Sequence, residues 1–481
     1  MATEKTTLIT NTSYIVGCEN DQHYLLKNGQ LAYRGNEIIF VGKNYEGPVD
    51  ETIDARGGFV VPGLINLHCH LANSSQEKGF IEDTGSPYMY MTGMYEYLYV
   101  TLLDPRFQMG VYNFSILDIM SKGSTTVFDL GMGMPSQIEA LGRSGIRAYV
   151  GPMAHPCDFR TLDGRVPHYD WDLPHGYARL EETIRLKEKY DGSFNDRIRI
   201  AFDPLIIDGC PPEYLKVLRQ MMDAYPDMIC AIHAAQSVIE YNVMIQRYGL
   251  SPADYLAEYG ICGPNVHYGH YILPARHSLN AFKIGNELKT IADTKTNVIH
   301  CPWTFGRRGI IMESFQKYQD LGINMCLGTD TFPQDILNEM RYAAVFCKIA
   351  EGCNPYTGTA ASIFNAATIN GAKALNRPDL GRLQPGAKAD MLLISTDNLE
   401  CPPLRDPIKV LVYTAASRNI ERVIIDGEEV VTEGVAKYID AEDARQQMQA
   451  AQELMLKNIP NRDWGHRDQY ELSPMSFPVR E

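Results

Sequence analysis

The sequence lacks the long apolar runs of a membrane protein and the basic excess of a nucleic-acid-binding protein. No uninterrupted apolar stretch reaches the roughly 18 residues that are needed to span a bilayer. Asp and Glu number 59 against 44 Lys and Arg, which gives a net charge of −15. We therefore expect neither nucleic acid nor a membrane as a partner. The N-terminal segment MATEKTTLIT carries an early acid and no long apolar core, so we do not expect a secretory signal.

The sequence also lacks a cysteine framework. Its 11 cysteines stand at irregular spacings in a chain of 481 residues, which is long enough to bury a core without disulfides. We expect free thiols in a reducing compartment and hence a cytoplasmic location. The hydrophobic fraction of 45% and the charged fraction of 21% are ordinary for a globular protein. These features are typical of a large enzyme.

Short apolar runs recur along the middle of the chain and alternate with amphipathic stretches. Such runs predict buried parallel strands covered by helices. There are eight of them over the span of a (β/α)₈ barrel with insertions: residues 58–70, 125–131, 147–152, 197–206, 228–235, 265–272, 297–302 and 323–330. The sequence therefore predicts the α/β class with a TIM barrel.

Both ends of the chain differ from the middle, because they consist of short β segments with turns. We expect residues 1–57 and 386–439 to meet as one small β-sandwich beside a barrel formed by residues 58–385. Residues 440–481 predict a C-terminal helix and an extended tail. Such a tail fits a contact with a neighbouring subunit, so we expect a homo-oligomer.

Several histidines fall at the predicted carboxyl ends of strands, where barrel active sites are built. His68 and His70 alternate along the first strand and therefore project to the same side. His233, His270 and Asp330 end the fifth, sixth and eighth strands. Imidazoles with a carboxylate suit Zn²⁺, and Fe²⁺ is the alternative. Each residue alone has a structural interpretation, such as a core histidine at 233 or a helix cap at 330.

The motifs that contain these residues resemble the amidohydrolase superfamily, in its cytosine-deaminase-like and triazine-hydrolase-like branch. The resemblance rests on six segments in family order: PGLINLHCHL (62–71), HAAQSVIEY (233–241), GHYI (269–272), IHCPWTFGRRG (299–309), LGTDTFPQDILNEMR (327–341) and GRLQPGAKADMLLI (381–394). It covers nearly the whole chain, from about residue 7 to residue 436.

The resemblance implies one catalytic divalent metal ion, held by four ligands: His68, His70, His233 and Asp330. It also implies that His270 lies beside the metal-bound water, and that His270 and Asp330 orient this water and relay its proton. The segment FDPLIIDG (202–209) contains no lysine that could bridge a second metal. One ion per chain is therefore expected.

Gln236 departs from the family pattern, which has Glu at this position in the deaminases. An amide cannot pass a proton to a ring nitrogen, although it can still donate a hydrogen bond. In one interpretation Gln236 only binds substrate while His270 and Asp330 handle the protons. In the other, the substrate does not require ring protonation. Glu240 shares a helix face with Gln236 one turn further on, and we expect it to lie too far from the metal to replace the missing Glu.

The loop after the seventh strand also departs from the family pattern. Trp303 and Phe305 are expected to form an apolar wall for a flat ring. Arg307 and Arg308 are candidates to bind a substrate carboxylate or another anion, the alternative being ion pairs with surface acids. The segment 85–101, rich in Tyr and Met, is either a lid over the site or a subunit interface.

These features predict a metal-dependent aminohydrolase. Metal-bound hydroxide would attack an sp² carbon of a small N-heterocyclic or amidine-like substrate and release ammonia or an amine. One alternative keeps the site but changes the leaving group, as in dehalogenation, C–S cleavage or amide hydrolysis. A second alternative is a non-catalytic scaffold of the same fold, which the intact set of four ligands disfavours.

Overall fold

Eight buried parallel strands form the centre of the molecule. The computed structural model describes residues 5–72, 74–282 and 285–480. The central strands form two four-stranded sheets with the orders β13-β10-β9-β8 and β14-β15-β16-β17. Their bounds are β8 Leu64–Cys69, β9 Ser124–Gly131, β10 Arg147–Pro152, β13 Ile198–Ile200, β14 Cys230–Ala234, β15 Val266–His270, β16 Asn297–His300 and β17 Met325–Leu327. The α/β class predicted from the sequence is confirmed.

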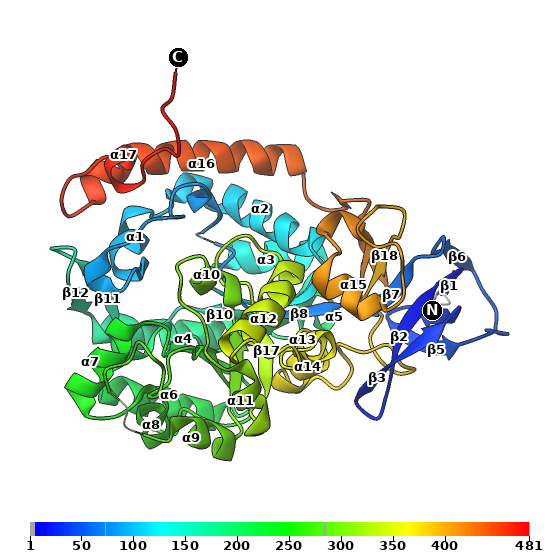
Figure 1. Cartoon of the computed structure of the whole chain (residues 1–481), viewed down its shortest axis with the longest axis horizontal. Coiled ribbons are helices and arrows are strands. Elements are labelled where there is room, and N and C mark those ends of the chain that lie inside the picture. Colours follow the sequence, from blue (N-terminus) through cyan, green and yellow to red (C-terminus); the bar gives the residue numbers. More distant parts are fainter. Residues whose placement is uncertain (1–4, 73, 283–284, 481) are drawn as a thin grey trace.

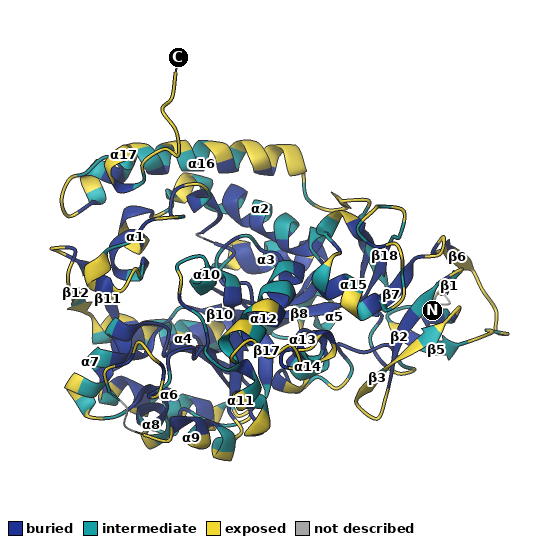
Figure 2. Ribbon diagram, in the orientation of Figure 1, coloured by how far each residue is buried: buried dark blue, intermediate teal, exposed yellow. Residues whose placement is uncertain are grey.

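The edges of the two sheets approach each other through isolated parallel bridges. Phe202, after β13, bridges to Cys230 of β14, and Cys69 at the end of β8 bridges to Asp330 after β17. Helices lie outside the strands (Figure 1). The longer ones are α2 Gln108–Ser121, α3 Pro135–Ser144, α4 Leu173–Tyr190, α6 Pro212–Ala224, α7 Val238–Tyr248, α9 Glu287–Thr294 and α12 Ile336–Ala350. The strands are buried, and the exposed residues lie mostly on the outer faces of helices and in loops (Figure 2).

The first predicted strand, residues 58–70, divides at Gly63. Its first part is β7 (Phe59–Pro62), which pairs antiparallel with β18 and parallel with β2 in a mixed sheet, and its second part is β8. A Cβ atom on Gly63 would lie 2.1 Å from Oγ1 of Thr125. Only glycine therefore allows β9 to pack this closely against the point where the chain leaves one sheet for the other.

The two ends of the chain meet in two further sheets. A seven-stranded sheet has the order β21-β20-β19-β18-β7-β2-β3, and a four-stranded sheet has the order β5-β4-β1-β6. The bounds are β1 Thr6–Thr10, β2 Tyr14–Glu19, β3 Gln22–Lys27, β4 Gln30–Arg34, β5 Glu37–Gly42, β6 Glu51–Asp54, β18 Met391–Ile394, β19 Ile420–Ile425, β20 Glu428–Thr432 and β21 Val435–Ala436. One buried apolar cluster includes Ile9 and Leu31 of the smaller sheet and Val60 and Leu393 of the larger one.

A buried ionic cluster joins the central strands to these outer sheets. Arg147, the first residue of β10, donates from Nε to Oδ2 of Asp390 at 2.9 Å and from Nη2 to Oδ1 of Asp426 at 3.2 Å. Asp390 precedes β18, and Asp426 follows β19. The carbonyl oxygen of Asp196 accepts from Nη1 at 3.3 Å. The side chain of Arg147 is only 1% exposed, so these contacts replace the hydration of a full charge.

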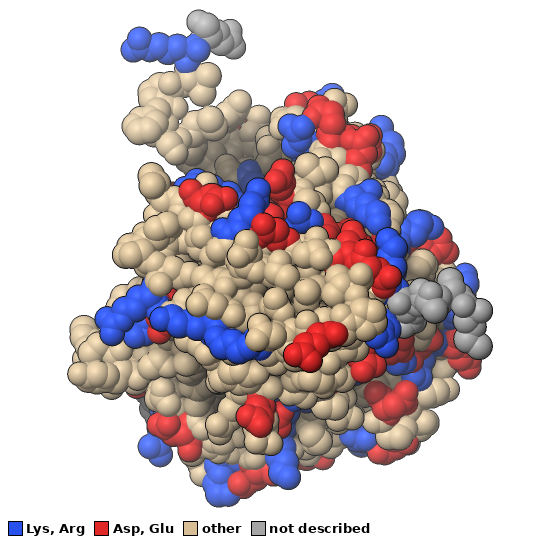
Figure 3. Space-filling view, turned by 90° about the vertical axis from the view of Figure 1, so that its right-hand side faces the viewer, with Lys and Arg blue, Asp and Glu red and all other residues tan. Residues whose placement is uncertain are grey.

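The C-terminal helix α16 (Ala441–Arg462) packs along α2 and over the short helix η1 (Ser75–Glu77). Beyond it, Arg467 pairs with the buried Glu96 of α1 (Met94–Val100) at 2.9 Å. The last residues project from the body of the molecule (Figure 3). On the face of the body shown there, acidic and basic side chains are interspersed. No helix in the described part of the chain is both long enough and apolar enough to cross a membrane.

Candidate metal centre and substrate cavity

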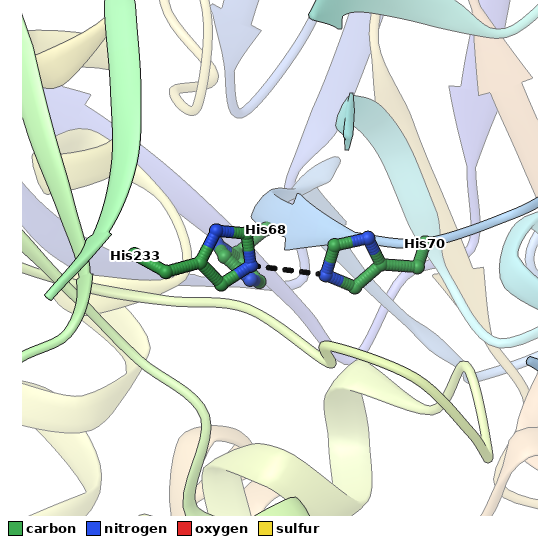
Figure 4. A group of neighbouring side chains, drawn as sticks. All are labelled: His68, His70 and His233. Atoms are coloured by element: carbon green, nitrogen blue, oxygen red, sulfur yellow. Dashed lines mark hydrogen bonds between the residues drawn. The ribbon is translucent and has the colours of Figure 1, made fainter. Parts of the chain in front are cut away.

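Three histidines converge at the carboxyl ends of two strands. His68 lies on β8 and His70 directly follows the last residue of this strand, so the alternation of the extended chain directs both toward the same side. His233 reaches the same point from β14. Ligand nitrogens of the three rings lie within 4.8 Å of one another. Nε2 of His70 lies 3.2 Å from Nε2 of His233 (Figure 4).

The hydrogen bonds of these rings fix which nitrogens face one another. Nδ1 of His70 lies 2.7 Å from the carbonyl oxygen of Leu130, and Nδ1 of His233 binds the carbonyl oxygen of Leu205. A carbonyl oxygen only accepts, so each Nδ1 donates, and in the neutral imidazole each Nε2 keeps a bare lone pair. Nε2 of His68 is buried without a hydrogen-bond partner. Converging lone pairs of this kind repel one another unless a cation lies between them, and the donors fit a divalent metal ion.

Asp330 lies beside these histidines and is tied to them through its backbone as well as its carboxylate. Oδ1 lies 3.3 Å from Nε2 of His70 and 3.9 Å from Nε2 of His68. The Asp330 amide donates to the carbonyl of His68 at 2.8 Å, and the His70 amide donates to the carbonyl of Asp330 at 2.9 Å. A Cβ atom at Gly328 would lie 2.8 Å from that His68 carbonyl oxygen. Glycine at 328 therefore allows the approach that sets Asp330 beside the histidines.

Burial and the neighbouring groups set the charges of these side chains. Burial lowers the pKa of His68 and His233, so both rings are neutral. Burial would also raise the pKa of Asp330, but His70, His270 and His233 together outweigh this effect and the pKa is lowered. The carboxylate is therefore ionised. The pKa of His70 is raised in turn, because Asp330 outweighs the effect of burial.

His270 ends β15 beside the three converging rings. Its ring centroid lies 4.6 Å from that of His68 and 4.7 Å from that of Phe305. Both of its ring nitrogens are buried without a hydrogen-bond partner, and burial lowers its pKa to about 4. His270 is thus a neutral imidazole with two unused hydrogen-bonding positions. His68, His270 and Cys301 form a second group of neighbouring ligand atoms, in which burial raises the pKa of the thiol.

Three non-glycine residues at these strand ends adopt left-handed backbone conformations. The φ angles are 52° at Ala235, 73° at His270 and 59° at Asp330. Such conformations cost about 1–3 kcal/mol each and persist where the surroundings impose them. Here they turn the chain sharply at the end of each strand, so that the side chains of adjacent residues face the same space.

Gln236 lies beside these groups and carries an unpaired side-chain donor. It follows Ala235, and the amides of both residues donate to the carboxyl group of Glu240 on α7, at 3.3 Å for Gln236. Nε2 of Gln236 is buried without a hydrogen-bond partner. Glu240 is therefore engaged with the loop backbone, which orients Gln236, and it does not take the position of a catalytic acid.

A cavity of about 200 Å³ opens beside the histidines. Its lining includes His70, His233, Gln236, Phe305, Arg307, Arg308 and Asp330 from the predicted site, and Thr92, Gly93, Met94, Tyr97 and Leu98 from the segment 85–101. That segment thus covers the site, as the lid interpretation predicts. Trp303 is not among the described residues that line the cavity, because its ring stacks on Tyr342 of α12 at 4.6 Å.

Sequence reasoning missed two acids that shape this cavity. Glu77 lines it, and burial raises its pKa to about 7. Asp208 lies behind the lid and accepts hydrogen bonds from Tyr95 of α1, at 2.7 Å, and from Tyr169 of β12 (Pro167–Trp171). Neither acid stands at a spacing that signals a site. Only the folded chain brings the hydroxyls of two distant segments onto one carboxylate.

Comparison with known proteins agrees with this geometry. Residues 59–430 match the sequence model of the Amidohydrolase family. A 5'-deoxyadenosine deaminase of Methanosarcina acetivorans is 26% identical over 462 residues, covering 94% of this chain and 99% of the relative. A 5-methylthioadenosine/S-adenosylhomocysteine deaminase of Thermococcus kodakarensis is 28% identical over 423 residues, covering 84% and 93%. The structure of an atrazine chlorohydrolase from Arthrobacter aurescens, complexed with zinc, superposes with a TM-score of 0.78 at 23% identity, covering 93% of this chain and 100% of that one.

Proposed function

The chain belongs to the amidohydrolase family, and from this premise we propose that it removes an exocyclic amine from a small N-heterocycle, such as the adenine ring of a nucleoside. It is a metal-dependent hydrolase that acts on carbon–nitrogen bonds other than peptide bonds. The bare Nε2 atoms of His70 and His233, 3.2 Å apart in the wall of a cavity, carry the proposal. The deaminase relatives support the choice of an amine as the leaving group.

One zinc ion per chain, held by His68, His70, His233 and Asp330, is part of this proposal, with Fe²⁺ as the alternative. When bound, such an ion supplies the Lewis acidity that makes water nucleophilic at neutral pH. Zinc-bound structural neighbours support this choice of metal. Since both Nδ1–H groups are committed to carbonyl oxygens, His70 and His233 can offer only Nε2 to the ion.

The other side chains divide the work of binding and proton transfer. Asp330 is ionised and can accept the proton of the attacking water. His270 is neutral and has two free nitrogens, so it can orient that water or hand a proton to the departing amine. Gln236 donates from Nε2 to an acceptor on the substrate ring, and Phe305 packs on the ring face.

Gln236 also favours a second candidate, because an amide cannot protonate a ring nitrogen. A substrate with a leaving group such as halide needs no such protonation, and the superposed chlorohydrolase has this fold. Cleavage of a C–S or amide bond belongs to the same candidate. Against a non-catalytic scaffold stand the converging donors and the unpaired polar atoms of His270 and Gln236.

Metal analysis and product analysis of the same full-length sample test the proposal. We expect about one zinc or iron per chain, and release of ammonia or an amine from a panel of aminated and halogenated N-heterocycles. Release of halide instead would move the reaction to the second candidate. A protein that holds no metal after zinc is added, and that releases nothing, would refute the ligand assignment.

Substitution of Gln236 tests its role as a donor to substrate. Gln236→Leu keeps the bulk of the side chain but leaves the substrate acceptor unpaired, so we expect kcat/KM to fall about 10- to 100-fold. Gln236→Glu retains a hydrogen-bonding group, and we expect it to keep more activity than Leu. Steady-state ammonia release measures both variants. Unchanged kinetics in the Leu variant would remove Gln236 from the substrate contacts.

Several coarser features extend the proposal to the whole molecule. We propose that the two parallel sheets, bridged at both edges, close into a (β/α)₈ barrel over residues 58–385. Residues 1–57 and 386–439 would form the sandwich together with β7 from the start of the barrel segment, and residues 440–481 the appended helix and tail. A homo-oligomer in the cytoplasm completes the proposal, supported by the projecting tail and by 11 free cysteines (Figure 1).

A further inference from the structure

Two arginines line the cavity without a close carboxylate partner. The nearest carboxylate to Arg307 is that of Glu82, at 3.8 Å. Its guanidinium donates hydrogen bonds of 3.3 Å to Oγ1 of Thr331 and the carbonyl of Phe332, and lies 4.6 Å from the centroid of the Phe332 ring. The side chain of Arg307 is only 6% exposed, and its Nε is buried without a hydrogen-bond partner. A guanidinium desolvated to this extent normally forms a close carboxylate pair.

Arg308 extends this positive charge toward the lid. Its Nη1 donates to the carbonyl of Met91 at 3.2 Å, and a Cβ atom on Gly93 would lie 2.6 Å from the same nitrogen. Within residues 5–72, 74–282 and 285–480, no carboxylate lies within 4.0 Å of this guanidinium. Burial, and next the charge of Arg307, lower the pKa of Arg308.

The acids near the arginines offset only part of this charge. Glu77 lines the same cavity, but its carboxyl group accepts from Thr101, and burial raises its pKa to about 7. Glu82 remains 38% exposed, and water screens its interaction with Arg307. The lid side of the cavity therefore presents two cations, the buried guanidinium of Arg307 and the half-buried guanidinium of Arg308. Nε of Arg307 has no hydrogen-bond partner.

We propose that Arg308, together with Arg307, forms a subsite for a carboxylate or phosphate group of the substrate. The guanidinium fork matches the paired oxygens of either anion. The inference rests on the proposed function and deepens it: the substrate is an amino-substituted heterocycle whose far end carries an anion. The lid carbonyl of Met91 then bonds the back of the guanidinium and orients it toward that anion.

Three compounds that share adenine and ribose test the subsite: neutral 5'-deoxyadenosine, S-adenosylhomocysteine with its carboxylate, and adenosine 5'-monophosphate with its phosphate. The full-length zinc-loaded protein is compared with Arg308→Met and Arg307→Met. The matched control is Arg185→Met, on the exposed face of α4, where Arg185 pairs only with Glu181 and Glu182 of the same helix. The kinetics of ammonia release and the equilibrium binding affinity are measured for each protein with each compound.

We expect the wild type to favour one anionic compound, and this preference identifies the anion as carboxylate or phosphate. Arg308→Met should lower kcat/KM and affinity for that compound about 10- to 100-fold. It should leave 5'-deoxyadenosine within about threefold of wild type. Arg185→Met should leave all three compounds unchanged.

The possible failures can be told apart. If Arg308→Met weakens all three compounds equally, Arg308 is a structural contact of the lid, and the subsite is refuted while the deaminase proposal stands. Loss of anion binding in the variant, with no ammonia from any compound, would refute deamination of adenosines and keep the subsite. If neither anionic compound binds the wild type better than 5'-deoxyadenosine, the subsite is refuted.

Discussion

Asp330→Asn is expected to lower kcat by at least about 10³-fold while leaving the fold intact. The substitution preserves the shape of the side chain and the two backbone hydrogen bonds that tie residue 330 to His68 and His70. It removes the negative charge beside Nε2 of His70, 3.3 Å away, and an amide can neither accept the proton of water nor balance a divalent ion.

Metal content and ammonia release, measured on the same preparation, separate the two roles of Asp330. Loss of metal together with activity identifies a ligand whose charge is needed for binding. Retained metal with lost activity identifies a proton acceptor. Asp320→Asn on the exposed side of α11 (Phe315–Asp320) serves as the control and should behave as wild type. More than a tenth of wild-type activity in Asp330→Asn would contradict both roles.

The strands and the converging donors were predictable because both depend on local pattern. Apolar runs without alternation indicate strands buried on both faces, and each predicted run contains one central strand of the structure. A histidine or aspartate at the carboxyl end of such a run must point into the mouth of the sheet. Regular backbone thus positions His68 and His233, whereas Asp330 follows β17 in a left-handed turn.

The walls of the cavity were less predictable because they consist of short helices and loops. The hydrophobic periodicity of the sequence does not show where such a short helix begins. Trp303 and Phe305 were expected on one wall, which would hold for an extended chain. They lie instead in α10 (Pro302–Gly306), where residues two apart point in nearly opposite directions. Phe305 therefore faces His270 while Trp303 stacks on Tyr342.

Contacts between distant segments were not predictable at all. Asp208 accepts hydrogen bonds from the hydroxyls of Tyr95 and Tyr169 only because α1 and the hairpin that contains β12 pack together. The position of Arg308 at the cavity likewise depends on a distant segment, because its guanidinium donates a hydrogen bond to the carbonyl of Met91. These contacts shape the surroundings of the cavity, and under the proposed function the sequence therefore indicates the reaction more clearly than the substrate.

The same reliance on distant contacts makes Asp390→Ala the substitution with the largest expected effect on stability. It removes the carboxylate that takes two hydrogen bonds from Arg147, of 2.9 and 3.2 Å, and that also accepts the amide of Asp426. Asp426 remains as a carboxylate partner at 3.2 Å and the carbonyl of Asp196 as an acceptor at 3.3 Å, so the guanidinium stays buried after losing the carboxylate that accepts two of its hydrogen bonds. We expect the free energy of unfolding to fall by about 3 kcal/mol.

Denaturant unfolding followed by circular dichroism measures this loss of stability. Glu181→Ala is the control, because the ion pair of Glu181 with Arg185 is exposed and should contribute little.

Because Arg147 begins β10 while Asp390 and Asp426 flank β18 and β19, the cluster couples the central strands to the sheets built from the chain ends. A single unfolding transition shifted to lower denaturant would show that both parts unfold together. Two separated transitions in the variant would mean that this ionic cluster is what couples them. No shift would show that the buried charge of Arg147 is compensated by Asp426 alone.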